Sequence, residues 1–225
     1  MPTTPLYVDA VIFDMDGVIT HTMPDHHRAW REVLAAYDIR VTHHDIYSRE
    51  GQPGDEALVE IYQKYNVSYA PEDIARVLAE KEAHFKENVR QRFVRGTRTF
   101  LKKLHRDGFR LALVTGTARH ELQMILPARL AGLFDVIITG DDVRRGKPDP
   151  EPFVRALRRL GLPADEAIVI ENAPYGIRAA KAAGLRCFAL ETSLSREYLE
   201  EADEVFATIN DLTRKIQFSR CHEKP

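Results

Sequence analysis

Short apolar runs that alternate with amphipathic helical patterns restrict the fold of this chain more than any other feature. Each run is bounded by turn residues and is long enough for one buried strand of a parallel sheet. The runs cover residues 7–13, 110–115, 136–139, 167–171 and 186–190, with a weaker one at 204–207. The helical patterns cover residues 97–106, 118–130, 150–160 and 174–183. This alternation predicts an α/β fold with a doubly wound parallel sheet.

A helical stretch with no convincing strand interrupts the alternation after the first run. Apolar residues recur there at helical spacing, from Pro24 onward, within residues 54–65 and within residues 71–89. We therefore expect two units: an α/β core of residues 1–20 and 94–225, and an all-helical cap of residues 21–93. The last residues, from about 219, are expected to be loose.

Charge and composition exclude several classes of partner. A formal net charge of -2 gives no basic surface for nucleic acid or for an anionic membrane. Residues 1–5 lack the basic start of a signal peptide, and no later segment is apolar enough to span a bilayer. Cys187 and Cys221 occur in contexts that do not suggest a disulfide. We expect a cytoplasmic protein, a monomer or weak dimer, that binds a small molecule.

Two carboxylates follow the first predicted strand. Asp14 and Asp16 precede the turn residue Gly17, and residues i and i+2 of an extended backbone point to the same side. Two carboxylates at this range resist joint ionisation, so the pair implies a metal ion or a shared proton. Taken alone, the same pattern also fits an ordinary polar turn after a strand.

The other predicted strands also end in polar groups, and in a parallel sheet these ends meet at one edge. Thr115 and Gly116 follow the second run and can hold a phosphate through a hydroxyl and backbone N–H groups. Lys147 precedes the helix at residue 150 and offers a cation. Glu171 and Asn172 end the fourth run with oxygen ligands suited to a hard cation. Their convergence is a much stronger signal than the aspartate pair alone.

Structural alternatives exist for most of these residues. Thr115 can cap a helix, Lys147 can be a solvated loop residue, and Asn172 can serve only as a turn residue. His26 shares a helical face with apolar residues and can simply pack inside the cap. Lys81 lies beside an apolar face, where its stem can pack while the amine stays in water.

Four segments together resemble, in order, the four motifs of the haloacid dehalogenase-like superfamily. They are residues 13–18 (FDMDGV), 114–116 (VTG), 147–148 (KP) and 169–172 (VIEN). The resemblance covers nearly the whole chain, and the helical insert stands where this superfamily carries a C1 cap. Residues 14–20 (DMDGVIT) and 28–30 (RAW) are similar to the β-phosphoglucomutase branch and its sugar-phosphate phosphatases. The resemblance implies a Rossmann-like core.

The resemblance also implies a mechanism. Asp14 would attack a phosphate monoester and form an aspartyl-phosphate, while Asp16 would act as the acid and base. Mg²⁺ would bind the Asp14 carboxylate, the Asp16 backbone carbonyl and motif four. Thr115, with Gly116, and Lys147 would hold the phosphoryl group.

Motif four departs from the acidic pair of many relatives. This chain has Glu171 followed by Asn172, so one negative charge is missing. We expect Glu171 to be the principal metal ligand and Asn172 an assisting one, with weaker Mg²⁺ affinity as the consequence.

In the cap, the resemblance implies that His26, Gly54 and Lys81 face the substrate. The mutase branch has a basic residue at the position of Gly54 to hold a second phosphate, and a lysine at the position of Ala118. Both changes favour a phosphatase of a small phosphorylated metabolite, with sugar phosphates as one class. The alternatives are a β-phosphoglucomutase-type mutase and a non-catalytic phosphometabolite-binding protein.

Overall fold

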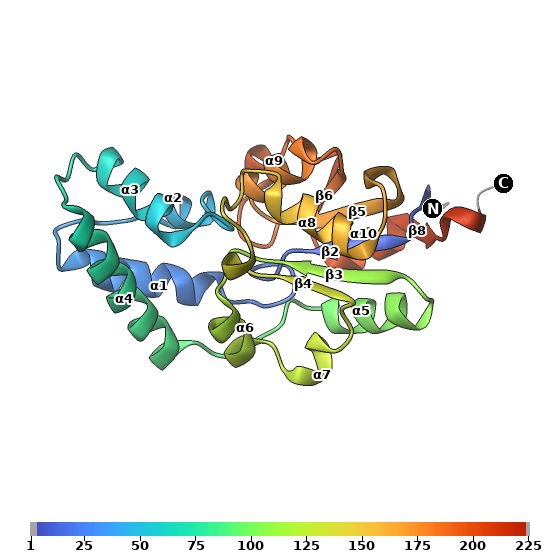
Figure 1. Ribbon diagram of the computed structural model, residues 1–225, viewed down its shortest axis with the longest axis horizontal. Coiled ribbons are helices and arrows are strands. Elements are labelled where there is room, and N and C mark those ends of the chain that lie inside the picture. Colours follow the sequence, from blue (N-terminus) through green and yellow to red (C-terminus); the bar gives the residue numbers. More distant parts are fainter. Residues whose placement is uncertain (1–3, 224–225) are drawn as a thin grey trace.

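Six parallel strands form the central sheet of this computed structural model, which describes residues 4–223 (Figure 1). The strands are β2 (Ala10–Phe13), β3 (Arg110–Val114), β4 (Val136–Ile138), β5 (Ala167–Glu171), β6 (Arg186–Leu190) and β7 (Glu204–Phe206). Their order is β4-β3-β2-β5-β6-β7, so the direction of winding reverses at β2. The predicted doubly wound parallel sheet is confirmed, and a binding site is expected beyond the carboxyl ends of β2 and its neighbours.

The three central strands are in register. Phe13 of β2 pairs with Leu113 of β3 on one side and with Ile170 of β5 on the other. Because the strands end level, the residues that follow each of them emerge at the same edge of the sheet.

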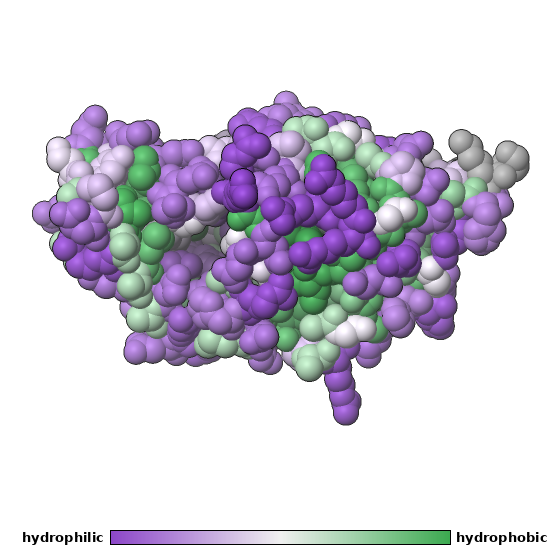
Figure 2. Space-filling view, in the orientation of Figure 1, coloured by the Kyte–Doolittle hydropathy of each residue, from purple (hydrophilic) through white to green (hydrophobic). Residues whose placement is uncertain are grey.

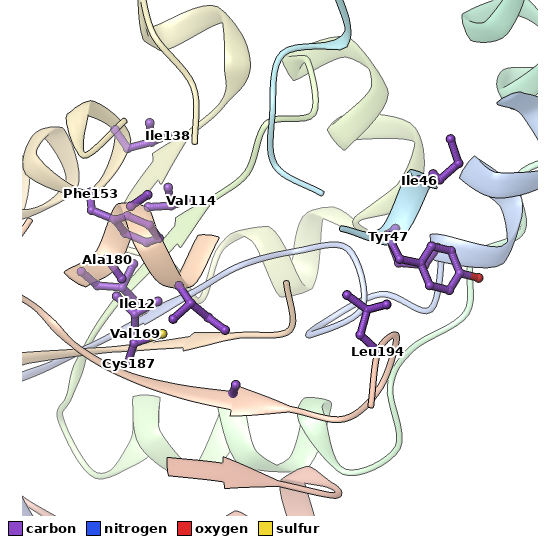
Figure 3. Close-up of a cluster of buried hydrophobic side chains, with 14 of the residues drawn as sticks. Ile12, Ile46, Tyr47, Val114, Ile138, Phe153, Val169, Ala180, Cys187 and Leu194 are labelled. Atoms are coloured by element: carbon purple, nitrogen blue, oxygen red, sulfur yellow. The ribbon is translucent and has the colours of Figure 1, made fainter. Parts of the chain in front are cut away.

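Both faces of the sheet are buried, which explains why the strands read as continuous apolar runs. Ile12, Val114 and Val169 pack on one face against Phe153 of the helical layer (Figure 3). The alternate residue Phe13 packs on the other face, with its ring centroid 6.0 Å from that of Phe100.

Helices cover both faces of the sheet (Figure 1). The helices of this part are α5 (Thr97–Arg106), α6 (Arg119–Ile125), α7 (Ala128–Ala131), α8 (Glu151–Leu160), α9 (Pro174–Ala182) and α10 (Ile209–Lys215). The single helix expected over residues 118–130 is wrong, because Leu126 precedes Pro127 and is extended, which ends α6. Short 3-10 helices lie at η1 (Gly140–Asp142), η2 (Ala164–Glu166), η3 (Arg196–Tyr198) and η4 (Cys221–Glu223).

A small second sheet joins the two ends of the chain. β1 (Thr4–Tyr7) pairs in parallel with β8 (Ile216–Ser219). The expected strand over residues 7–13 is therefore wrong in extent, since the chain changes sheets at Val8 and Asp9. The expectation of a loose tail is also wrong for residues 219–223. Arg220 there donates to the Asp9 carboxylate at 2.6 Å and anchors the tail; residues 1–3, 224 and 225 lie outside the described part.

Four helices form a separate group at the left of Figure 1: α1 (Met23–Ala35), α2 (His43–Tyr47), α3 (Gly54–Lys64) and α4 (Pro71–Asn88). The short helix α2 was not expected. Two adjacent segments connect this group to the sheet, and the Val94 amide donates to the Ile19 carbonyl at 3.0 Å. No helix among residues 4–223 has the length and apolarity needed to cross a membrane.

Candidate active site

The predicted residues from four strand ends meet at one edge of the sheet. Asp14 follows β2, Thr115 follows β3, and Glu171 ends β5. Lys147 reaches them from the loop between β4 and α8, and its Nζ lies 2.6 Å from Asp14 Oδ1 and 2.7 Å from Glu171 Oε1. All four side chains are buried, so the structure brings together residues that are far apart in the sequence.

The ammonium group of Lys147 is held by oxygen atoms and lies 5.2 Å from the centroid of the Phe153 ring. It also donates to the Val114 carbonyl at 3.1 Å. Burial disfavours its charged form, but the carboxylates of Asp14 and Glu171 outweigh this cost and hold the pKa of Lys147 above its usual range. These pairings favour a positive charge on Lys147 beside Asp14.

Asp14 carries an unusual carboxyl group. Burial raises the pKa of Asp14 to about 8; Lys147 opposes this rise, whereas Glu171 and Asp16 add to it. Its Oδ1 pairs with Lys147, while the buried Oδ2 has no hydrogen-bond partner. An unpartnered buried carboxylate oxygen is costly unless a cation or proton meets it.

Asp16 lies in a different environment. Thr117 donates to its Oδ2 at 2.9 Å, Thr22 donates to its Oδ1, and His26 Nε2 lies 3.5 Å from Oδ1. Burial opposes ionisation, but these polar neighbours prevail and hold the pKa of Asp16 below its usual range. The ring of His26 stacks on Phe85 at 4.1 Å between centroids, and its Nε2 lies near Asp16, so His26 both packs within the helical group and reaches this carboxylate.

The two residues of motif four, Glu171 and Asn172, have different hydrogen-bond partners. The Glu171 carboxylate accepts hydrogen bonds from Lys147, from the backbone N–H of Asn172 at 2.8 Å and from the backbone N–H of Ala173 at 3.2 Å. The Asn172 side chain donates to Ser193 Oγ at 2.8 Å, and its buried Oδ1 has no hydrogen-bond partner. Of the two residues, Asn172 thus has the side-chain oxygen that is free to bind a metal ion, whereas the sequence favoured Glu171 as the principal metal ligand.

A cavity of about 340 Å³ opens beside these groups, between the sheet and the helical group. Figure 2 shows a hollow between these two parts of the molecule. The predicted residues that line the cavity are His26, Gly54 and Lys81 from the helical group, with Thr115, Gly116 and Lys147 from the sheet side. Lys81 Nζ lies 5.0 Å from the centroid of the Phe85 ring and 5.8 Å from that of Trp30, so its ammonium group lies over two aromatic rings in the wall of the cavity.

The loop between α2 and α3 rests directly on the turn at Thr115 and Gly116. A Cβ atom at Gly116 would lie 2.8 Å from the Gly51 carbonyl oxygen, and one at Gly51 would lie 2.5 Å from Lys147 Cδ. Arg49, on the same loop, donates to Glu60 at 2.9 Å and to the Asp45 carbonyl at 2.9 Å. Arg49 also lines the cavity, but these two hydrogen bonds hold its guanidinium group against Glu60 and Asp45.

The family of haloacid dehalogenase-like hydrolases matches residues 8–184 of the chain. The chain belongs to this family. It is 35% identical over 181 residues to the phosphorylated carbohydrates phosphatase of Thermotoga maritima, covering 79% of this chain and 82% of that protein. It is 33% identical over 205 residues to the validoxylamine A 7'-phosphate phosphatase of Streptomyces hygroscopicus subsp. limoneus, covering 90% and 93%.

Among solved structures, β-phosphoglucomutase from Clostridium difficile matches with a TM-score of 0.79 at 26% identity, covering 91% of this chain and 93% of that one. The predicted family and fold are thus confirmed. The named phosphatases among the relatives also bear out the prediction of a phosphoric monoester hydrolase.

Hydrolases of this family typically use a divalent metal ion. The residues present fit such an ion, because Asp14 Oδ2 and Asn172 Oδ1 are buried oxygen atoms without a partner. The neighbouring carboxylate of Asp16 adds negative charge. This oxygen-only set suits a hard cation.

Sequence reasoning missed three residues of this site. Thr22 and Thr117 donate to Asp16, and Glu50 lines the cavity. Burial raises the pKa of Glu50 well above its usual range, and Asp16 and Asp14 raise it further. Thr117 could have been found, since it lies two residues after Thr115 in the same turn; nothing in the sequence shows that residue 50 meets this edge.

Proposed function

We propose that this hydrolase is a Mg²⁺-dependent phosphatase that acts on a small phosphorylated metabolite through an aspartyl-phosphate. The placement of Asp14 carries the proposal: its carboxylate lies at a strand end, paired with Lys147 at 2.6 Å, next to a second carboxyl group in a different environment. Two carboxyl groups whose environments differ in this way suit a nucleophile and a proton carrier.

Asp14 acts as the nucleophile. Its carboxylate oxygen bonds to phosphorus as the bond from phosphorus to the leaving oxygen breaks, and water later releases inorganic phosphate. Lys147 favours the ionised form of Asp14, and Thr115 with Gly116 holds the phosphoryl oxygens. Asp14, the Asp16 backbone carbonyl and Asn172 would hold Mg²⁺, with Glu171 positioning Lys147. When bound, Mg²⁺ supplies positive charge that offsets the charge of the phosphoryl group.

Asp16 moves the proton. A phosphoryl group beside Asp16 adds negative charge, which raises the pKa of this carboxyl and lets it carry a proton. The proton passes to the leaving alcohol in the first step, and Asp16 takes one from the attacking water in the second. His26 and Thr117 hold the carboxylate in place between the steps.

The helical group, residues 21–93, serves as the cap over a core of residues 1–20 and 94–225. The cap wall of the cavity favours a phosphatase over a mutase. Gly54 supplies no cation there, and Glu50 adds a carboxyl group where a bisphosphate would need a positive one. Lys81 and His26 remain to contact the small substrate. The free thiols Cys187 and Cys221 suit a reducing cytoplasm, and a monomer or weak dimer remains our expectation.

The test is phosphate release from a panel of phosphomonoesters, with Mg²⁺ and with a chelator. We expect Mg²⁺-dependent release that falls more than about 1000-fold in Asp14→Asn. Asp165→Asn, at an exposed position of the core, is the matched control and should leave the rate unchanged.

Two results would contradict the proposal. Bisphosphate-dependent isomerisation of a sugar phosphate without net release would establish the mutase instead. Binding of phosphoesters without any hydrolysis, unchanged in Asp14→Asn, would establish a non-catalytic binding protein.

A further inference from the structure

Three side chains from the cap and the core meet at the rim of the cavity. Glu82 belongs to α4 of the cap, whereas His120 and Glu121 belong to α6 of the core. One imidazole nitrogen and two carboxylate oxygens, one from each residue, all lie within 4.8 Å of one another. His120 Nε2 and Glu82 Oε2 are 3.8 Å apart, which is too long for a direct hydrogen bond and leaves room for an ion between them.

Glu121 provides an independent sign that the cluster can take a cation. Only 5% of this residue is exposed, and its buried Oε1 has no hydrogen-bond partner. Burying a carboxylate oxygen without a partner is costly, so a cation at this point would stabilise the structure. The residue also lines the cavity, as does Glu82, which gives an ion a path from solvent.

The protein groups at the cluster do not balance its charge. Lys86 Nζ lies 3.7 Å from the same Glu82 Oε2 that faces His120, but Lys86 is exposed. An exposed pair of this kind is weak. Two carboxylates with one imidazole therefore form a set that a divalent cation can complete.

We propose that Glu82, His120 and Glu121 form a second divalent-metal site that ties the cap to the core. Its donors differ in kind from those at Asp14, because an imidazole nitrogen accompanies two carboxylates. This mixture suits Zn²⁺ or another first-row transition ion better than Mg²⁺, which prefers oxygen ligands alone. An ion here joins α4 to α6 and favours the closed position of the cap.

The first test is Zn²⁺ binding to the metal-free full chain, measured by calorimetry in excess Mg²⁺, which keeps the oxygen-only site filled. We expect one Zn²⁺ per chain, with affinity at least tenfold weaker in His120→Ala and in Glu82→Gln. His105→Ala and Glu87→Gln are matched controls, since both residues are exposed on α5 and α4 and lie outside the cluster. Equal affinity in the wild type and in both cluster variants would overturn the site.

The second test asks whether the ion bridges the two parts. Hydrogen exchange of the wild-type chain should slow in both α4 and α6 when Zn²⁺ is added, and in neither helix of the His120→Ala variant. Slower exchange in only one of the helices would overturn the bridge. Neither readout depends on phosphatase activity, so the two proposals fail or stand separately.

Discussion

The ammonium group of Lys147 lies between two carboxylates, but it leaves Asp14 Oδ2 without a partner. Without a metal ion, the pKa of Asp14 is raised to about 8, mainly by burial, so this carboxyl holds its proton at pH 6 and releases it only as the pH rises through that value. Below about pH 8, a cation that binds Asp14 must therefore displace a proton.

From this we predict that Mg²⁺ binding releases protons and strengthens between about pH 6 and pH 8. Calorimetry in two buffers with different ionisation enthalpies measures the number released. The Asp14→Asn variant should show weaker binding with less proton release. Binding whose strength and proton count do not change over this range would show that the Asp14 carboxyl is already ionised.

Asn172 allows a test of which motif-four residue contacts the ion. The side-chain amide of Asn172 donates to Ser193 Oγ and leaves its Oδ1 without a partner. The variant Asn172→Asp keeps the shape of this side chain and adds a negative charge. We predict that this change raises Mg²⁺ affinity about tenfold. It should also lower the melting temperature of the metal-free protein, because Asp14 and Glu171 are already close. Unchanged Mg²⁺ affinity would favour Glu171 as the direct ligand.

At the scale of elements, the short helix α2 depends on one buried carboxylate. Asp45 accepts from the Thr42 amide at 2.8 Å, from the Thr42 hydroxyl at 2.7 Å and from Tyr65 at 2.9 Å, and it also pairs with Lys64. Burial raises its pKa, but the Lys64 and Thr42 hydrogen bonds outweigh burial and hold the pKa of Asp45 below its usual range. This contribution to stability is present above the unfolded pKa of 3.8 and is lost as the pH falls below it.

We predict that Asp45→Asn lowers the free energy of unfolding by about 1–3 kcal/mol near pH 7, since a buried charged acceptor is removed. The Lys64 part of this is small, because Lys64 is 48% exposed. Urea unfolding should show the difference shrinking toward about pH 3. Asp73→Asn is the matched control: Asp73 also accepts from the amide three residues before it, at 2.8 Å, but its side chain is 29% exposed and should cost less. A difference that grows as the pH falls would contradict the sign of the shift.

Elements whose signals are local could be predicted from the sequence, and those fixed by distant contacts could not. The pattern over residues 97–106 matches α5 at both ends, because its apolar face and the preceding Gly96 are local features. In contrast, β1 exists only because β8 pairs with it across the whole chain. Helix α2 has only 5 residues, too few for a periodic pattern, although Thr42 and Asp45 form a capping box.

At the scale of the whole molecule, the site also combines residues with local sequence signals and residues placed by contacts between distant segments. The four motifs could be predicted, since each follows its own strand and parallel strands end at one edge. The cap contacts could be predicted only in part. His26, Gly54 and Lys81 line the cavity, but Glu50 was not expected there, because residue 50 is brought over the edge by folding of the entire helical group. The loop at residues 49–54 lies close against the core at Gly116, Gly146 and Lys147.

The close fit of the helical group against the core depends on the lack of a side chain at Gly146. A Cβ atom there would lie 2.5 Å from Pro53 Cδ and 2.7 Å from Cγ. We predict that Gly146→Ala holds the cap away from the core and lowers kcat/KM about tenfold, or about 1.4 kcal/mol. The matched control is Gly132→Ala in the core, where the nearest atom would be the Ala128 carbonyl oxygen at 3.3 Å.

The adjacent Lys147 offers a competing explanation, which a double variant separates. If the new methyl group acts by striking the cap, Pro53→Ala removes the atoms that it strikes, and the pair Pro53→Ala and Gly146→Ala should recover most of kcat/KM. If it acts instead by displacing Lys147 from Asp14, the second change recovers nothing. We would measure kcat/KM of the wild type, the two single variants and the double variant, with melting temperatures to verify folding. The comparison decides whether the methyl group acts by contact with Pro53 or by displacing Lys147.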